Sequence, residues 1–287
     1  MQFEIKNVLL WENMDMKKFL GIFFICLLAL VSVSLYYFNR WKPLWALDVP
    51  IEIYSVAHHQ DDTLRIVMIG DSWVGMRTES LNGMFQKRLS SIMDRPVIFK
   101  TKGKGGEKSR GIYQLMFEED RFGSKPLLLS GVDYCIIFAG INDAAANLGQ
   151  KQYVHYMNQI IDFLLVNHIR PVLIEIPDVN IWNVYGKKPI KDLTVDYIRS
   201  LMTGCGMYHF SGYRDALKTM LKDSALNDSV LYVPMREWNG DGEELNRLLC
   251  LDDQIHLNPQ GYIKMDSCII ESIRKDLKKF KDTTLFN

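Results

Sequence analysis

The sequence has no surplus of charge of either sign, since Lys and Arg total 34 and Asp and Glu also total 34 among its 287 residues. Balanced charge gives no argument for nucleic acid or for an acidic partner. Internal repeats, heptad arrays and low-complexity tracts are also missing, so neither a solenoid nor a coiled coil is indicated. What remains is ordinary globular composition, 48% hydrophobic and 24% charged, with enough chain for one sizeable core.

Cysteines are few, and none lies in a Cys/His cluster with the spacing of a zinc site. Cys26 lies within an uncharged apolar run, and Cys135 lies within an apolar stretch that predicts a buried strand. Cys205, Cys250 and Cys268 are left, an odd number, so a Cys205–Cys250 disulfide is left open without being required. The cysteine count therefore neither supports nor excludes an oxidising compartment.

Residues 19–38 form an uncharged apolar run near the N-terminus. In a helix, which rises about 1.5 Å per residue, the run is long enough to cross the roughly 30 Å hydrocarbon core of a bilayer. A cleaved signal peptide is the alternative, but the run is long for one and no A-x-A-like cleavage site follows it. We therefore predict a tail at residues 1–18 and one membrane anchor at residues 19–38, with the following domain outside the cytoplasm, periplasmic or extracellular.

After a linker at residues 39–62, apolar runs typical of strands alternate with helical periodicity through residues 63–287. The expected strands are residues 64–70, 96–101, 132–139, 171–176 and 230–234. The expected helices are residues 78–93, 109–119, 152–168 and 260–280. Such alternation predicts one α/β domain with a five-stranded parallel sheet that helices cover on both faces, giving three layers, α/β/α.

Residues 178–212 interrupt this alternation with a long aromatic stretch that predicts no regular element. A long excursion after a strand end is usually functional or mobile. We interpret it as a partial lid or substrate wall, with a packed surface excursion as the alternative.

Polar and glycine-rich blocks follow four of the predicted strands, at residues 70–72, 102–109, 140–143 and 251–262. The carboxyl ends of parallel strands share one edge of the sheet, where open α/β folds place their ligands, so we expect these blocks to meet. Ser72 at such a strand end is a candidate nucleophile near a helix N-terminus. The alternative is a helix cap, for which serine and aspartate are both preferred.

The blocks resemble, in type and in order, those of the SGNH/GDSL hydrolase family. They are Gly-Asp-Ser with Ser72, a glycine loop with Gly106, Gly-x-Asn-Asp with Asn142, and Asp-x-x-His with Asp253 and His256. The resemblance covers about residues 64–275. It implies a flavodoxin-like fold and acyl transfer from esters, with no metal and no organic cofactor.

The chemistry explains why these residue types occur together. A serine hydroxyl is a poor nucleophile until a base takes its proton, and His256 is the candidate base for Ser72. Asp253, three residues before His256, can orient the imidazole and stabilise its charged form. Asp252 is a rival orienter, but its offset of four residues departs from the family pattern.

The tetrahedral intermediate of acyl transfer also needs hydrogen-bond donors directed at its oxyanion. The expected donors are the backbone N–H of Ser72, the Asn142 side-chain amide and a glycine N–H of the second block. Setting that block against the family pattern indicates Gly106, with Gly105 in the place of a more usual serine. A phosphate-binding loop is excluded, because Glu107 stands where the last glycine of that motif belongs.

We predict that Trp73, Arg110 and Trp182 contact the substrate. The basic residues Lys102, Lys104, Lys108 and Arg110 near Gly106 suggest an anionic substrate, with a solvated basic loop as the alternative. The resemblance and the anchor together favour a membrane-anchored serine esterase that removes O-acetyl or other small acyl groups from envelope or extracellular carbohydrate. The alternatives are an O-acyltransferase that uses the same triad, a lipid esterase and a non-catalytic tethered factor. The partners are then an ester substrate and the membrane, not nucleic acid.

Overall fold

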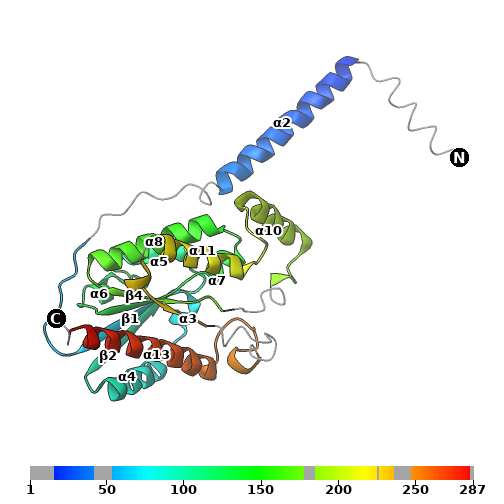
Figure 1. Cartoon of the computed structure of the whole chain (residues 1–287). Helices are drawn as coiled ribbons and strands as arrows, with labels where there is room; N and C mark the ends of the chain where they lie inside the picture. Colours follow the sequence, from blue (N-terminus) through cyan, green and yellow to red (C-terminus); the bar gives the residue numbers. More distant parts are fainter. Residues whose placement is uncertain (1–15, 42–53, 178–184, 225, 236–246, 285–287) are drawn as a thin grey trace. The chain divides into compact units, whose positions relative to one another are not determined.

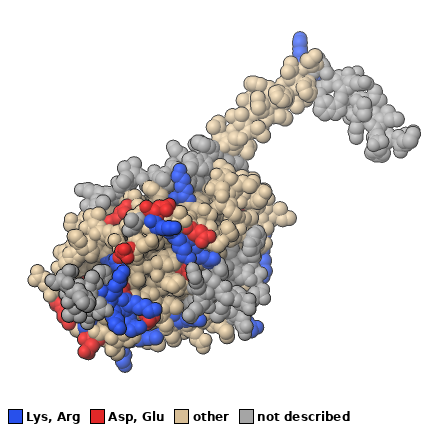
Figure 2. Space-filling model, in the orientation of Figure 1, with Lys and Arg blue, Asp and Glu red and all other residues tan. Residues whose placement is uncertain are grey.

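The computed structural model describes residues 16–41, 54–177, 185–224, 226–235 and 247–284. The chain divides into two compact units, residues 1–47 and residues 48–287. The first unit contains helix α2 (Met16–Trp41), whose stretch Met16–Tyr36 is long and apolar enough to span a bilayer. Figure 2 shows blue side chains at the outer end of α2 and uncharged side chains along the stretch that follows. A signal sequence would have the same length and composition.

The second unit is built on a five-stranded parallel sheet in the order β2-β1-β3-β4-β5. The strands are β1 (Leu64–Gly70), β2 (Val97–Gly103), β3 (Tyr134–Phe138), β4 (Arg170–Ile174) and β5 (Leu231–Val233). Every residue of β3 is buried, as expected for a central strand of a parallel sheet with both faces covered. The predicted strand count and parallel direction are confirmed.

Helices cover both faces of the sheet, which confirms the three-layer α/β/α architecture (Figure 1). One layer contains α4 (Glu79–Met93) and α13 (Pro259–Thr284), which contact each other. The opposite layer contains α5 (Ser109–Leu115), α8 (Gln150–Val166) and α11 (Phe210–Asp223). The shorter helices are α3 (Ser72–Gly75), α6 (Lys125–Leu128), α7 (Ile141–Ala145) and the 3₁₀ helix η2 (Leu226–Asp228).

The excursion at residues 178–212 differs from its prediction as an irregular stretch. It contains α10 (Ile190–Thr203) and the beginning of α11, while residues 178–184 lie outside the described residues. The aromatic residues on both sides of residues 190–203 obscure the helical periodicity of this segment. The excursion is therefore largely a helical insertion after β4.

The linker predicted at residues 39–62 is also shorter in the structure. Helix α2 continues to Trp41, and the chain already packs on the second unit at Tyr54, whose hydroxyl donates to the Met116 carbonyl at 2.7 Å. Val56 is buried, and its N–H donates to the Asn167 side chain at 2.7 Å. The domain therefore begins before residue 63.

Candidate active site

The catalytic edge of the sheet is formed by three adjacent strands that end level with one another. Gly70, the last residue of β1, pairs in register with Gly103 of β2 and Phe138 of β3. The three polar blocks that follow these strands therefore begin side by side. This is the arrangement that the sequence predicted for the Ser72, Gly106 and Asn142 blocks.

Gly70 is required where β1 turns into α3. A Cβ atom at this position would lie 2.4 Å from the Phe138 carbonyl oxygen and 2.7 Å from the Val74 side chain. Asp71 caps α3, because its side chain accepts the Trp73 N–H at 3.0 Å. Ser72 is the first residue of the helix and Asp71 is its cap. The alternative interpretation of Ser72 as a helix cap is therefore wrong.

Ser72, His256 and Asp253 form a continuous chain of hydrogen bonds. The Nε2 atom of His256 lies 2.9 Å from Ser72 Oγ, and its Nδ1 atom lies 2.6 Å from Asp253 Oδ2. A carboxylate only accepts, so Nδ1 carries the proton toward Asp253 and Nε2 is left to accept the proton of the Ser72 hydroxyl. The geometry is that of a nucleophile, a base and an orienter.

The Asp253 carboxylate is held by its own loop. Its second oxygen accepts the backbone N–H groups of Ile255 and His256, both at 2.9 Å. Partial burial raises the pKa of Asp253, but the hydrogen bonds from His256 and the two backbone N–H groups outweigh it and leave the pKa below its ordinary value. Asp253 therefore stays ionised and can stabilise a protonated His256. Its neighbour Asp252 is exposed.

A narrow loop presents Asp253 and His256 to Ser72. The loop closes through a bridge between Cys250 and Leu257 and through a bond from the Leu251 N–H to the His256 carbonyl at 2.7 Å. Both Cys250 and Cys205 are free thiols, so the disulfide left open by the sequence does not form.

Helix α13 begins directly after this loop with a capped first turn. Asn258 accepts the Gly261 N–H at 2.9 Å, and Pro259 occupies the first helical position, where its missing N–H is harmless. The start of α13 thus fixes the direction from which His256 approaches Ser72.

Two contacts fix α13 against α3 and the segment between α3 and α4, and the sequence prediction missed both. The Tyr262 hydroxyl donates to the Trp73 carbonyl at 2.9 Å. Arg77 forms a buried bidentate pair with Asp266, at 2.8 and 3.0 Å, and its guanidinium lies between the rings of Phe99 and Tyr262. Arg77 and Asp266 are 189 positions apart in the sequence, so no local sequence pattern indicates that they pair.

Trp73 does not have the predicted contact with substrate. Its side chain is only 1% exposed and stacks on Phe138, with ring centroids 4.6 Å apart. Trp73 belongs to the core because α3 turns its second residue inward beneath the catalytic edge. Trp182 lies outside the described residues, and contact between Arg110, the second residue of α5, and substrate stays a prediction.

Of the expected oxyanion donors, the Asn142 amide lies beside Asp71, the residue before Ser72, and beside the glycine loop. The Asn142 amide nitrogen donates to the Glu107 carbonyl at 2.9 Å and to Asp71 Oδ2 at 3.1 Å, which holds the side chain between the first and second blocks. A Cβ atom on Gly105 would lie 4.0 Å from the Ser72 Cβ, whereas one on Gly106 would have no neighbour within 4 Å. Gly106 instead adopts a positive φ of 75° in a turn closed by the Glu107 N–H and the Lys104 carbonyl. Its role in the oxyanion hole stays a prediction.

A pair of buried carboxylates supports the same edge. Ser109 donates to Asp143 through its hydroxyl, at 2.6 Å, and through its backbone N–H, at 2.9 Å, which joins the glycine loop to the Asn142 block. Burial raises the pKa of Asp143 to about 6, although the bonds from Ser109 oppose the shift. Burial also raises the pKa of Asp71 to about 7, against the opposing Trp73 N–H. The sequence prediction did not assign Ser109 or Asp143 a role.

The lysines of the glycine loop have partners within the chain. Lys104 pairs with Glu107 at 2.6 Å, Lys102 donates to the Arg121 carbonyl at 3.0 Å, and Lys108 donates to the Gly106 carbonyl at 3.0 Å. The three lysine charges are therefore not held free for an anionic substrate. The contacts favour the alternative interpretation, a solvated basic loop. Among the residues that the structure describes, no group of three or more His, Cys, Asp or Glu side chains could hold a metal ion.

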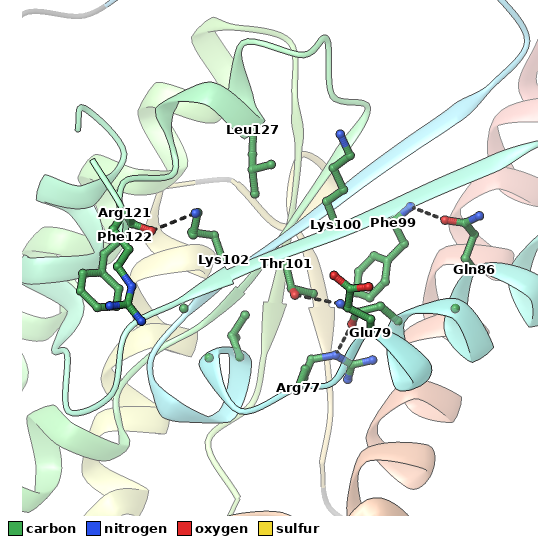
Figure 3. A pocket seen from close by; sticks show the side chains of 15 residues that line it. Arg77, Glu79, Gln86, Phe99, Lys100, Thr101, Lys102, Arg121, Phe122 and Leu127 are labelled. Atoms are coloured by element: carbon green, nitrogen blue, oxygen red, sulfur yellow. Dashed lines mark hydrogen bonds between the residues drawn. The ribbon is translucent and has the colours of Figure 1, made fainter. Parts of the chain in front are cut away.

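A groove of about 670 Å³ runs along edge strand β2 (Figure 3). Val74, Gly75 and Gly103 are among its lining residues and lie close along the chain to Ser72 and to the glycine loop, whereas Ser72, Asp253 and His256 do not line it. Lys100, Lys102, Arg121 and Phe122 line other parts of its wall. The groove therefore offers cationic and aromatic side chains beside the catalytic edge.

Comparison with known families shows which one this chain matches. The sequence profile of the GDSL-like lipase/acylhydrolase family matches residues 68–263, which is more than half of the chain and includes all the blocks described above. The chain belongs to this family. It is therefore an ester-hydrolysing enzyme of the GDSL/SGNH type. Among curated proteins, none is similar enough in sequence to count as a match.

Solved structures agree with the fold of this GDSL-like enzyme. A lipase/acylhydrolase from Enterococcus faecalis is 14% identical, with a TM-score of 0.54, over 74% of this chain and 96% of that chain. The psychrotrophic esterase EstA from Pseudoalteromonas sp. is 14% identical, with a TM-score of 0.53, over 76% and 100% of the two chains. The acetyl xylan esterase AlAXEase is 15% identical, with a TM-score of 0.51, over 73% and 100%. At such low identity the likeness supports the shared fold and not a shared substrate.

Proposed function

We propose that this GDSL-like hydrolase is a membrane-anchored serine esterase that removes O-acetyl or other small acyl groups from envelope or extracellular carbohydrate. The observation that carries the proposed mechanism is the hydrogen-bonded chain from Asp253 through His256 to Ser72. It gives the serine a base within 2.9 Å and gives the base an anionic partner within 2.6 Å. A serine hydroxyl needs both to attack an ester at neutral pH.

The first half of the reaction forms an acyl-enzyme. The Ser72 oxygen bonds to the ester carbonyl carbon while its proton passes to His256 Nε2, and the carbonyl electron pair moves onto the oxygen. When that pair returns, the bond to the alcohol breaks and His256 gives its proton to the departing alcohol. Asp253, ionised and bonded to Nδ1, stabilises His256 while it carries the extra proton.

The second half uses water in the place of the alcohol. His256 takes one proton from water, the water oxygen bonds to the acyl carbon, and the second tetrahedral intermediate releases the acid and returns the proton to Ser72. In both halves the oxyanion is stabilised by the Ser72 N–H, by a glycine N–H of the loop at residues 103–106 and by the Asn142 amide, which exchanges one of its two present bonds, to Asp71 or to Glu107, for the oxyanion. Each donor of this kind is typically worth about 3–4 kcal/mol of barrier.

The groove along β2 supports carbohydrate as the alcohol side of the ester. A groove of about 670 Å³ has room for several sugar units, and Phe122 and Arg121 give it an aromatic and a cationic wall. An acetyl xylan esterase shares the fold, so the fold is compatible with deacetylation of a polysaccharide. Arg121 offers a positive charge to a polymer that carries negative charge, although the lysines of the glycine loop have partners within the chain.

An O-acyltransferase is the second candidate. Attack on the acyl-enzyme by a sugar hydroxyl in the place of water uses the same Ser72, His256 and Asp253, so the two reactions differ only in which acceptor reaches the acyl carbon. A lipid esterase is a further alternative, which predicts a preference for long acyl chains.

Turnover of a series of p-nitrophenyl esters tests the proposal. The full chain in detergent micelles is compared with its Ser72→Ala variant, with circular dichroism to show that both are folded. We expect acetate to be the best substrate and the variant to lose about 10³-fold or more of the activity. Preference for long chains would favour the lipid esterase, and product formed only with a sugar acceptor would favour the transferase. Equal activity in the variant would refute serine catalysis.

A further inference from the structure

Helix α10 exposes most of its apolar residues while two of its polar residues, Asp196 and Ser200, are buried. Its apolar residues recur at helical spacing on the exposed side, with Ile190 82% and Leu201 63% exposed. The other members of this face are Tyr197, Ile198 and Met202. A surface helix normally turns such a face toward the core. We call these five residues the outer face of α10.

The side of α10 that faces the domain is polar instead. Asp196 and Ser200 are buried there. Asp196 accepts bonds from Lys188, at 2.7 Å, and from the Tyr208 hydroxyl, at 2.6 Å. Because these polar contacts fix the orientation of the helix, rotation of α10 to bury its outer face would leave the Asp196 carboxylate without them. The exposure of the outer face is thus built into the fold.

The base of α10 lies near the catalytic loop. Lys188 stands over the rings of Tyr185 and Tyr208, at 4.7 and 5.5 Å. Burial, and after it the Asp253 carboxylate, raise the pKa of Tyr185, so this ring lies within electrostatic reach of the triad. Figure 1 shows α10 outside the helical layers that cover the sheet. The segment that leads into α10 thus lies within electrostatic range of Asp253.

The chemistry of the outer face fits a bilayer surface. It presents aliphatic side chains and one tyrosine, while Lys187 and Lys191 are exposed around the N-terminal end of the helix, where they can meet lipid phosphates and outnumber the exposed Asp192. The apolar helix α2 supplies the second observation. The chain between Trp41 and Tyr54 can reach at most about 45 Å, so an anchored domain stays near the membrane.

We propose that α10 is a monotopic docking helix, whose outer face enters the interfacial layer of the same bilayer that α2 spans. The inference goes beyond the proposed reaction and rests on α2 as an anchor. Docking would hold the catalytic edge beside the membrane surface, so that esters on membrane-proximal polymers or glycolipids are reached before soluble ones.

Photolabelling from the lipid phase tests this docking. The full chain is reconstituted into vesicles of phosphatidylcholine and phosphatidylglycerol that contain a phospholipid with a diazirine near the top of its acyl chain. After illumination and proteolysis, labelled peptides are identified by mass spectrometry. We expect label on α2 and on the peptide that contains Tyr197, Ile198 and Leu201.

A double variant and a matched control decide the outcome. Ile198→Ser combined with Leu201→Ser changes only exposed side chains and should reduce α10 labelling by about tenfold or more while α2 labelling is unchanged. Met84→Ser combined with Ile92→Ser, which removes two similarly exposed apolar side chains from α4, should leave α10 labelling as it was. Label on α2 alone would overturn the docking and leave the anchor intact. Absence of label from both helices would overturn both proposals.

Discussion

At the scale of single residues, the adjacent carboxylates Asp252 and Asp253 provide a matched comparison. Both residues are exposed, and Asp253 bonds to His256 Nδ1 at 2.6 Å. We expect Asp253→Asn to lower kcat on the order of 10² to 10⁴-fold, because the amide cannot stabilise the imidazolium that forms during attack. Asp252→Asn should leave kcat within about twofold. Measurement of kcat and KM for both variants on one ester distinguishes the two. A larger loss with Asp252→Asn would reassign the orienter.

Asp71 predicts an unusual dependence of stability on pH. Its pKa is raised to about 7 in the folded chain, against about 3.9 when unfolded. Between these values the folded state holds a proton that the unfolded state has lost, so the contribution of Asp71 to stability is fully present below about pH 4 and is lost as pH rises to 7. Asp71→Asn, which keeps one oxygen for the Trp73 N–H, stays neutral at every pH.

The urea midpoint of unfolding, measured between pH 4 and pH 8, checks this prediction. We expect the decline with rising pH to be smaller in Asp71→Asn than in the unmodified chain. Part of the decline should remain, because burial also raises the pKa of Asp143, to about 6. Asp252→Asn serves as the exposed control. Identical pH profiles for the unmodified chain and Asp71→Asn would show that Asp71 ionises normally.

The residues whose roles could be predicted are those within short motifs. Asp253 and His256 are three positions apart, so their spacing along the chain already indicates a contact. Ser109 and Asp143 are 34 positions apart, and their bond depends on how β2 and β3 are placed around β1. For Trp73 the local sequence misled. Its position next to Ser72 suggested contact with substrate, but α3 directs its side chain into the core.

At the scale of elements, the catalytic base depends on how α13 is fixed to α3 and α4. The Arg77 side chain is fully buried and its charge is neutralised by Asp266 of α13. Asp266→Asn would leave a buried guanidinium without its carboxylate, which typically costs about 3–5 kcal/mol of the free energy of unfolding. We expect a clearly lower urea midpoint and, in the fraction that remains folded, a lower kcat.

A second ion pair on the same helix provides the control. Glu271 and Arg274 of α13 pair at 2.8 Å on the exposed surface, where water and salt screen the interaction. Glu271→Gln should therefore leave both the urea midpoint and kcat nearly unchanged. If both substitutions lowered the urea midpoint equally, burial of the Arg77–Asp266 pair would not add to its contribution to stability.

The elements themselves were predictable where periodicity is strong and uninterrupted. Strands β1 and β3 appear as apolar runs, and α8 and α13 have regular apolar faces, so their positions are confirmed to within a few residues. Helix α3 is too short to show a helical periodicity in the sequence, so it was not predicted. Helix α10 was missed because aromatic residues on both sides obscured its periodicity, and the outward direction of its apolar face could not be read from the sequence at all.

At the scale of the whole molecule, the remaining question is whether α2 stays with the catalytic domain. An uncleaved α2 predicts that the chain sediments with membranes, resists alkaline carbonate and has an intact mass that includes residues 16–41. Leu28→Arg, near the middle of the apolar stretch, should increase the fraction released by carbonate, because a charge at the centre of a span costs about 2.5–3.5 kcal/mol on insertion scales. Lys18→Arg, which keeps the flanking charge, should leave that fraction unchanged. A soluble chain whose mass begins after residue 38 would instead make α2 a signal sequence, and the hydrolase would then act away from the membrane.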